Sequence, residues 1–508
     1  MHKYKIFEGL GISLLITIHF VNGFHCRKLA FRIRTLESMR NENEDFADNQ
    51  HGQASALVLR FENMRQHGQR LFFDSHELEE IIEYYIDVNN TEKAFYAIEF
   101  AIDHYPGSTI FLLRKAQLLA ATNQTQKALS ILSSAEQLDG SNDELFMTKG
   151  GIYSQMGLSD QAIENYQKAL PFTESRDEVY LHIAFEFENT GKTEDAIHYL
   201  KKAAKENPEN EAALYELGFC FEITGKSAEA ITYYTQFLDK NPYSETAWFN
   251  LGVAYNRLKL YEKAILAYDY ALVIDESFAS AHFNKANSLA NLERFPEAIE
   301  TYKETFKYEH QDALCYYYIA ECYEKMEDFD AALIYYNKAI VLDPLLGDAW
   351  LGIGITLDCL NKSLEGKHYV KKAIELQPEN PIFWYVYGDL LKKLGFIEEA
   401  EFAYEKVCEL EPENNEIWMD YANLLEEKNE KTQALGILAE GVKNHPENAE
   451  LVYRIAACLF SLGQQQEGLT YLHRGLSLDY EKHTNLFNYF PTLKENVYVV
   501  GLIESYKK

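Results

Sequence analysis

The hydrophobic and polar positions of this chain repeat with a period of 34 residues. In the stretch AWFNLGVAYNRLKLYEKAILAYDYAL, residues 247–272, apolar side chains recur at helical spacing on both sides of a short polar break. The same order of first helix, break, second helix and turn can be laid over residues 75–482 without a gap. Twelve copies in unbroken register predict an all-α protein built from tandem helix pairs.

Small residues occupy two fixed positions of the period. A glycine inside a helix costs about 1 kcal/mol relative to alanine, so its recurrence predicts close helix contacts that recover packing and burial. Gly366 and Gly468 replace the alanine of the second series. The first series is Gly150, Ala184, Gly218, Gly252, Ala286, Ala320, Gly354, Gly388 and Ala422, and the second includes Ala128, Ala162, Ala196, Ala230, Ala264, Ala298, Ala332 and Ala400.

The turns and the tyrosines follow the same period. Proline marks the turn after the second helix in seven copies, because proline lacks an N–H and clashes with the preceding helical turn. These prolines are Pro106, Pro208, Pro242, Pro344, Pro378, Pro412 and Pro446. One tyrosine of the second helix also recurs, and we expect it in the core: Tyr166, Tyr234, Tyr268, Tyr302, Tyr336 and Tyr404.

The repeat resembles the tetratricopeptide repeat. The sixth copy carries the signature as Trp248, Leu251, Gly252, Tyr255, Ala264, Tyr268 and Ala271, and the tenth copy as Trp384, Gly388, Ala400, Tyr404 and Pro412. The resemblance implies a right-handed α-solenoid superhelix of stacked antiparallel helix pairs. It also implies binding of extended or helical segments of other proteins in a concave groove, which the first helices line.

Two neighbouring series would face that groove. One reads Tyr215, Phe249, Phe283, Tyr317, Leu351, Tyr385, Met419 and Tyr453, and the next contains Asn250 and Asn284, with Asn287 nearby. The asparagines resemble those of the O-GlcNAc transferase repeats, where amides hold a peptide backbone; the other interpretation is a solvated helix face. We predict partner contacts at Tyr215, Phe249, Asn250, Phe283, Asn284, Asn287, Tyr317 and Tyr385.

The net charge limits the class of partner. The chain has 48 basic and 79 acidic residues, for a net charge of −31, and such a surface repels phosphate backbones and anionic lipids. We therefore expect no nucleic acid, and favour basic or apolar protein segments. Chaperone-tail-binding members of the family use basic positions that are here Glu79, Glu178, Glu216 and Asp420, so an acidic C-terminal tail is not expected as a ligand.

The sequence contains no pattern typical of an enzyme. It has no glycine-rich phosphate loop, no HExxH pair and no GxSxG elbow, and its histidines lack metal-ligand spacing. Cys220, Cys322 and Cys458 share one repeat position and are expected to be reduced, buried and apolar. We predict a non-enzymatic, cytoplasmic scaffold or adaptor with no cofactor, metal or catalytic residue.

The N-terminal segment differs from the rest of the chain. Residues 1–38 carry six Lys or Arg and two Glu, and residues 10–24 form an apolar run, LGISLLITIHFVNGF. Three interpretations stay open: a mis-assigned start with translation beginning at Met39, a membrane anchor or uncleaved signal, and a cleaved signal. The alternative function is therefore a membrane-tethered or exported assembly or transport component, anchored through residues 6–24.

The remaining boundaries follow from the repeats. Residues 39–74 form an acidic leader, of which residues 53–74 are expected to cover the first repeat. Residues 75–482 are the twelve repeats, and residues 483–508 form a C-terminal capping helix. Thr492 and Glu495 are spaced as a capping box for that last helix.

Overall fold

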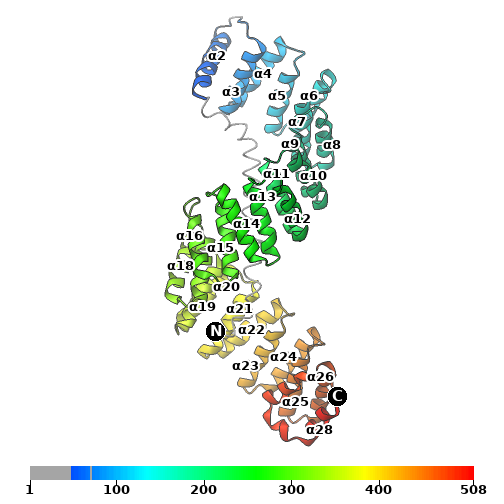
Figure 1. The fold of residues 1–508 in the computed structure, drawn as a ribbon, viewed down its shortest axis with the longest axis vertical. Helices are drawn as coiled ribbons and strands as arrows, with labels where there is room; N and C mark the ends of the chain where they lie inside the picture. The colour runs from blue at the N-terminus through cyan, green and yellow to red at the C-terminus, as the bar shows by residue number, and fades with distance from the viewer. Residues whose placement is uncertain (1–46, 69–70, 508) are drawn as a thin grey trace. The chain divides into compact units, whose positions relative to one another are not determined.

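The computed structural model describes residues 47–68 and 71–507. Within those residues the chain forms α-helices and short 3-10 helices with no strand (Figure 1). The all-α class and the stacking of antiparallel helix pairs are confirmed. The chain divides into two compact units, one ending at Lys263 and the other beginning at Ala264, so that the division falls within α14 (Tyr261–Ile274). Each unit is described by itself below.

The first unit holds the N-terminal helix and the first helix pairs. Helix α2 precedes the repeats, and the helices α3 to α12 then form five consecutive pairs, followed by α13. The helices are α2 (Ala47–His67), α3 (Ser75–Asp87), α4 (Thr91–His104), α5 (Thr109–Ala121), α6 (Thr125–Leu138), α7 (Asp143–Gln155), α8 (Ser159–Ala169), α9 (Arg176–Asn189), α10 (Thr193–Glu206), α11 (Glu211–Ile223), α12 (Ser227–Leu238) and α13 (Glu245–Arg257).

The second unit continues the pairs and ends in a short irregular segment. Its complete pairs run from α15 to α26, and four short elements follow them. These are α15 (Ala279–Asn291), α16 (Phe295–Thr305), α17 (Ala313–Lys325), α18 (Phe329–Leu342), α19 (Gly347–Cys359), α20 (Ser363–Leu376), α21 (Pro381–Leu394), α22 (Ile397–Leu410), α23 (Asn415–Glu427), α24 (Lys431–Asn444), α25 (Ala449–Ser461), α26 (Gln465–Leu478), η2 (Glu481–His483), α27 (Thr484–Tyr489), η3 (Pro491–Glu495) and α28 (Val497–Ser505).

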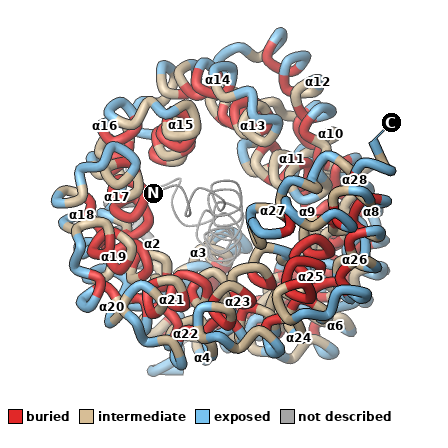
Figure 2. Tube along the Cα trace, turned by 90° about the horizontal axis from the view of Figure 1, so that it is seen from below, coloured by how far each residue is buried: buried red, intermediate tan, exposed pale blue. Residues whose placement is uncertain are grey.

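The observed helices keep the predicted period. Within each unit the first helix of nearly every pair begins 34 residues after the previous one; α9 alone begins one residue early, at Arg176. The first helix of each complete pair within a unit packs against its own second helix, and neighbouring first helices such as α5 and α7, or α17 and α19, also contact each other. Every unit therefore has one layer of first helices and one of second helices. In Figure 2, the buried stretches of α17 and α19 are longer than those of α18 and α20, whose outer residues are exposed.

The recurring Pro-Glu-Asn sequence ends one helix and starts the next. Pro208 follows α10, and Asn210 is the N-cap of α11, where its side chain accepts a hydrogen bond from the backbone N–H of Ala213 at 2.9 Å. Asn380, Asn414 and Asn448 cap α21, α23 and α25 in the same way. A side-chain oxygen at the N-cap satisfies backbone donors that have no partner within the helix. The motif therefore fixes both edges of the turn between repeats.

The break inside each repeat has one fixed backbone conformation. The fifteenth residue of each repeat lies in the break after the first helix, and it has a positive φ in all twelve repeats. It is glycine in five of them and asparagine in four, but Lys259, Glu293 and Glu327 occupy it in the other three. Left-handed backbone is unfavourable for residues with a Cβ atom, so these three repeats form the same turn at a local energetic cost.

The small residues of the repeats provide room for aromatic rings. A Cβ atom added to Gly388 of α21 would lie 2.6 Å from Cε1 of Tyr404, on the second helix of the same pair. The six recurring tyrosines of the second helices are all buried, as predicted. Cys220, Cys322 and Cys458 are also buried, as predicted. At Gly150 and Gly388 the glycine therefore makes room for the tyrosine of the same pair, whereas a Cβ atom added to Gly218 would meet Asn250.

Both ends of the repeats are covered by additional elements. Phe61 of α2 packs edge-on against Phe73 and Phe100, with ring centroids 5.5 Å and 5.4 Å away. At the C-terminal end Leu486, Leu493, Val499 and Ile503 join the core of α25 and α26. The predicted capping box at Thr492 and Glu495 is wrong, because both residues lie in η3 and the N-cap of α28 is Asn496, which accepts from the N–H groups of Tyr498 and Val499.

Candidate partner-binding surface

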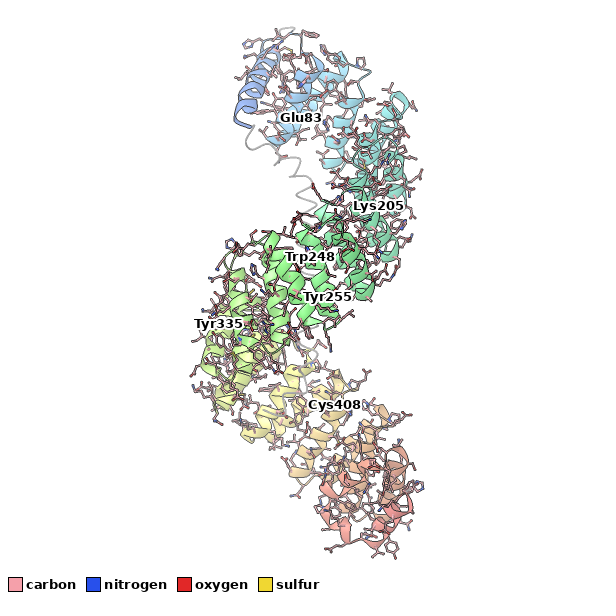
Figure 3. All side chains as sticks on the ribbon, in the orientation of Figure 1. Glu83, Lys205, Trp248, Tyr255, Tyr335 and Cys408 are labelled. Carbon is pink, nitrogen blue, oxygen red and sulfur yellow. The ribbon has the colours of Figure 1, made fainter. Side chains whose placement is uncertain are left out.

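The repeat signature locates the candidate surface on the first helices. Trp248 and Tyr255, two signature positions, both come from α13 (Figure 3). Trp248 donates its indole N–H to the carbonyl oxygen of Pro242 at 2.9 Å, and Trp350, Trp384 and Trp418 make the equivalent bond to Pro344, Pro378 and Pro412. These tryptophans are thus tied to the turn that precedes their helix. The side of the first-helix layer that faces away from the second helices is called the first-helix face below.

The predicted aromatic series is more deeply buried than expected. Phe249 has no exposed surface, and its ring lies 6.2 Å from the ring of Tyr215, which is half-buried. In the second unit Tyr317 and Tyr385 are buried and Phe283 is half-buried. Phe249 is predicted as a partner contact, but in the structure its ring is packed within the fold. Tyr215 and Phe283 have the more accessible rings.

The side chains of Asn250 and Asn284 also form hydrogen bonds within the fold. Asn250 is 5% exposed and donates its Nδ2 to the carbonyl oxygen of Leu214 at 2.9 Å, where it fills the space above Gly218. Asn284 donates to the carbonyl oxygen of Ser280 one helical turn earlier at 2.9 Å. Both amides therefore have acceptors within the fold, contrary to the expectation that they face a peptide backbone.

Asn287 differs from the other two asparagines. Its Oδ1 accepts a hydrogen bond of 2.5 Å from the hydroxyl of Tyr302, but its Nδ2 has no acceptor although the residue is 1% exposed. A buried donor without a partner is unusual in proteins. Asn287 lies 34 residues before Glu321, so the two side chains occupy the same position of successive first helices.

The first-helix face of the second unit combines tyrosines with carboxylates. Tyr317 donates to Glu321 at 2.8 Å within α17, and Tyr336 of α18 donates to Glu324 at 2.9 Å. Tyr385 donates to Asp420 and Tyr404 to Asp389, both at 2.5 Å. Asp348, at the start of α19, is half-buried. Tyr317 and Tyr385 of the aromatic series, and Tyr336 and Tyr404 of the second-helix series, thus hydrogen-bond to carboxylates of the first helices, which the sequence analysis did not predict.

Burial changes the titration of three of these carboxylates. It raises the pKa of Glu321 to about 7, with Glu324 and Asp348 adding to the shift and the Tyr317 hydrogen bond and Lys325 opposing it. Burial also raises the pKa of Glu324, against the hydrogen bonds from Tyr336 and Thr356, and raises the pKa of Asp348. Clustered carboxylates in a half-buried site favour either a proton or an added cation.

Other types of site are not observed in the part of the chain that the structure describes. Among those residues no group of three or more His, Cys, Asp or Glu side chains is arranged to hold a metal ion. The helices there are also too short or too polar to cross a membrane. The segment at residues 6–24, which the alternative function requires as an anchor, lies outside the described residues.

The comparisons with known families agree with the helix pairs. Tetratricopeptide repeat models match residues 143–170, 186–245, 224–279 and 313–344. A model described as anaphase-promoting complex, cyclosome, subunit 3 matches residues 393–475. A comparison with curated proteins finds no match.

Three similar solved structures share low sequence identity with this chain. The APC/C hetero-tetramer Cut9–Hcn1 has 13% identity and a TM-score of 0.38, covering 74% of this chain and 94% of that one. MamA has 20% identity and a TM-score of 0.30, with coverage of 32% and 95%. The C-terminal part of a TPR repeat-containing protein from Cytophaga hutchinsonii has 18% identity and a TM-score of 0.37, with coverage of 47% and 99%. From the helix register and the matching family models, this chain is a tetratricopeptide repeat protein.

Proposed function

We propose that this protein is a non-enzymatic scaffold or adaptor that binds segments of other proteins on its first-helix face. The observation that carries the proposal is the set of tyrosine-bonded carboxylates on the first helices of the second unit, at Glu321, Glu324, Asp389 and Asp420. Large aromatic side chains supply contact area at a small entropic cost, and fixed charges beside them select a partner.

The partner favoured by this chemistry is a basic or apolar protein segment. The face carries carboxylates, and the whole chain has a net charge of −31, so electrostatics favour cationic partners and oppose nucleic acid. Of the contacts predicted from the sequence, the proposed ones are Tyr215, Phe283, Tyr317, Tyr385 and Asn287. Phe249, Asn250 and Asn284 are assigned to the fold, since each is packed or hydrogen-bonded inside it.

A cytoplasmic adaptor needs no cofactor, and the proposal includes none. The alternative, a membrane-tethered or exported assembly component, depends on residues 6–24. Fractionation of cells with a mass-spectrometric determination of the native N-terminal residue separates the two. Native protein that retains residues 6–24 and sediments with membranes would favour the alternative.

A photo-crosslinking experiment tests the scaffold function. A photoreactive phenylalanine would replace Ile355, which is half-buried on α19 at the same repeat position as Glu321, and, as a control, Val341, which is exposed on α18. The expected result is a defined partner protein crosslinked at position 355 and not at position 341. Crosslinks at position 341 alone would move binding to the second helices, and no crosslink at either position would contradict the proposal.

A further inference from the structure

Helices α26 and α28, at the C-terminal end of the second unit (Figure 1), border an open groove. Thr470 of α26 occupies the repeat position of Ile334, which is exposed on α18. The groove therefore opens on the second-helix layer, whereas the contacts of the proposed scaffold function lie on the first helices. It has a volume of about 660 Å³ and is lined by Leu469, Thr470 and His473 of α26 and by Tyr498, Gly501, Leu502 and Ser505 of α28.

Helix α28 is apolar on two sides, but the fold uses only one of them. Val499 and Ile503 are buried in the core that α28 forms with α25 and α26. By contrast, Val497 and Tyr498 are 82% and 76% exposed. Nothing lies within 4 Å of a Cβ atom added to Gly501. The exposed side thus has a projecting tyrosine and, one turn later, a hollow, and exposed apolar surface of this kind marks an interaction site.

The groove is formed before any partner binds, because α28 is fixed at both ends. At its start, the Asn496 side chain accepts a hydrogen bond from the backbone N–H of Tyr498 at 3.1 Å. At its end, the Tyr506 hydroxyl lies 2.8 Å from Nε2 of His473 and 3.2 Å from Oγ of Ser477, both on α26. A surface that is already ordered loses less conformational entropy on binding.

The lining of the groove is uncharged, which is unusual for this chain. Charged residues make up 25% of the chain, and its net charge is −31. None of the seven lining residues is Asp, Glu, Lys or Arg, and Glu504, the one such residue of α28, is not among them. Two copies of an acidic chain repel each other where their charged surfaces meet, so an uncharged surface is where they can approach. A basic segment would find no carboxylate in this lining.

We propose that the groove between α26 and α28 is the contact between two copies of this chain, related by a two-fold axis close to Gly501. A two-fold contact uses the same surface on both copies, so that surface must supply both a projecting group and the hollow that receives it. Tyr498 and the hollow at Gly501 meet this requirement within one helix: the Tyr498 ring of each copy lies over Gly501 and Leu469 of the other. The dimer goes beyond the proposed scaffold function and does not depend on it.

Sedimentation velocity of the full chain at increasing concentration tests the dimer. The original chain should change from monomer to dimer, and Gly501→Glu, which places like charges near the axis, should raise the dissociation constant about tenfold or more. This variant keeps the fold, because the new side chain extends into open space and glutamate favours a helix more than glycine does. Thermal denaturation checks that point. A mixture of Gly501→Glu and Gly501→Lys chains should dimerise again, because the facing charges are then opposite.

The matched control is Val341→Glu, because Val341 is 77% exposed on α18 in the same unit. This variant should dimerise like the original chain. Equal weakening by Gly501→Glu and Val341→Glu would overturn the contact, because it would show general repulsion between acidic chains. A chain that stays monomeric at every concentration would overturn it as well, and so would a mixture of the two Gly501 variants that fails to dimerise.

Photo-crosslinking identifies what occupies the groove. A photoreactive phenylalanine would replace Tyr498 or, as a control, Phe402, which is 51% exposed on α22. In cells, position 498 should give a covalent dimer of this chain, and position 402 should not. A product at position 498 that contains another protein and no second copy would show that the groove binds that protein, and would overturn the dimer.

Discussion

Gly150 of α7 lies against the ring of Tyr166 of α8, so that a Cβ atom added to Gly150 would come within 2.5 Å of Cδ1 of the tyrosine. The neighbouring Gly151 points away from this contact, and nothing lies within 4 Å of the Cβ it would acquire. A Cβ atom is therefore excluded at one of these adjacent positions and tolerated at the other. The first is required by packing, and the second only lowers helix propensity.

Alanine at these two positions should shift stability in opposite directions. Gly150→Ala forces the Tyr166 ring out of a buried site and should lower the free energy of unfolding by about 1–3 kcal/mol. Gly151→Ala should raise it by up to about 1 kcal/mol through helix propensity. Urea denaturation midpoints of the two variants measure both effects, and equal shifts would show that the ring contact is misplaced.

Glycine should stabilise the turns that now hold a charged residue with a left-handed backbone. Glu327 has φ +61° between α17 and α18, where other repeats have glycine. Glu327→Gly removes the strain of a Cβ atom in that conformation and should stabilise the chain by about 0.5–1 kcal/mol after the larger entropy of the unfolded glycine is subtracted. The reverse change, Gly395→Ala at φ +80°, should destabilise it. Thermal denaturation of both variants tests the sign.

The indole of Trp384 connects its helix to the preceding turn. Its Nε1 donates to the carbonyl oxygen of Pro378 at 2.8 Å, six residues earlier. Trp384→Phe keeps an aromatic ring but removes the donor, and should cost about 0.5–1.5 kcal/mol of stability. Hydrogen exchange should show faster opening at the start of α21, whereas unchanged exchange there would mean that the bond contributes nothing.

The repeated features were the predictable ones. A glycine, a proline or a tyrosine that returns every 34 residues is seen many times in one sequence, so helix starts such as Ala279, Ala313 and Gly347 could be placed from the pattern alone. The left-handed turn was less visible, because Lys259, Glu293 and Glu327 carry no glycine signal. The helical pattern decides which face a residue occupies, but not the backbone conformation of the break.

The candidate site was predicted less well for a different reason. The period correctly places Asn250 on the first helix, but its burial depends on the space left by Gly218, which belongs to the previous repeat. Glu321 was missed because it is ordinary by itself and becomes unusual only through its burial and beside Glu324 and Asp348. Contacts between repeats therefore limit what a single-repeat pattern can show.

The burial of Phe249 predicts a role in stability. Because its side chain is fully buried, Phe249→Ala should lower the free energy of unfolding by about 3–5 kcal/mol. Phe283→Ala should cost less, since Phe283 is half-buried. Chemical denaturation of each single variant provides the measurement. Negligible loss for Phe249→Ala would return this residue to the set of exposed partner contacts.

Glu321 should make the stability of the chain depend on pH in a defined window. Its pKa is about 7 in the folded chain against an ordinary value of 4.5, so between these values the folded state binds the proton more strongly than the unfolded state. Stability contributed by the protonated form is present below about pH 4.5 and is lost as the pH rises through about 7.

Glu321→Gln cannot ionise and still accepts a hydrogen bond from Tyr317, so it should match the original chain near pH 4 and be more stable near pH 8. Urea midpoints measured across this range test the sign, with Glu365→Gln on the exposed side of α20 as the control. Parallel curves for Glu321→Gln and the original chain would mean that Glu321 is already charged and solvated in the free protein, and that Glu324, Asp348 and Lys325 do not alter its titration.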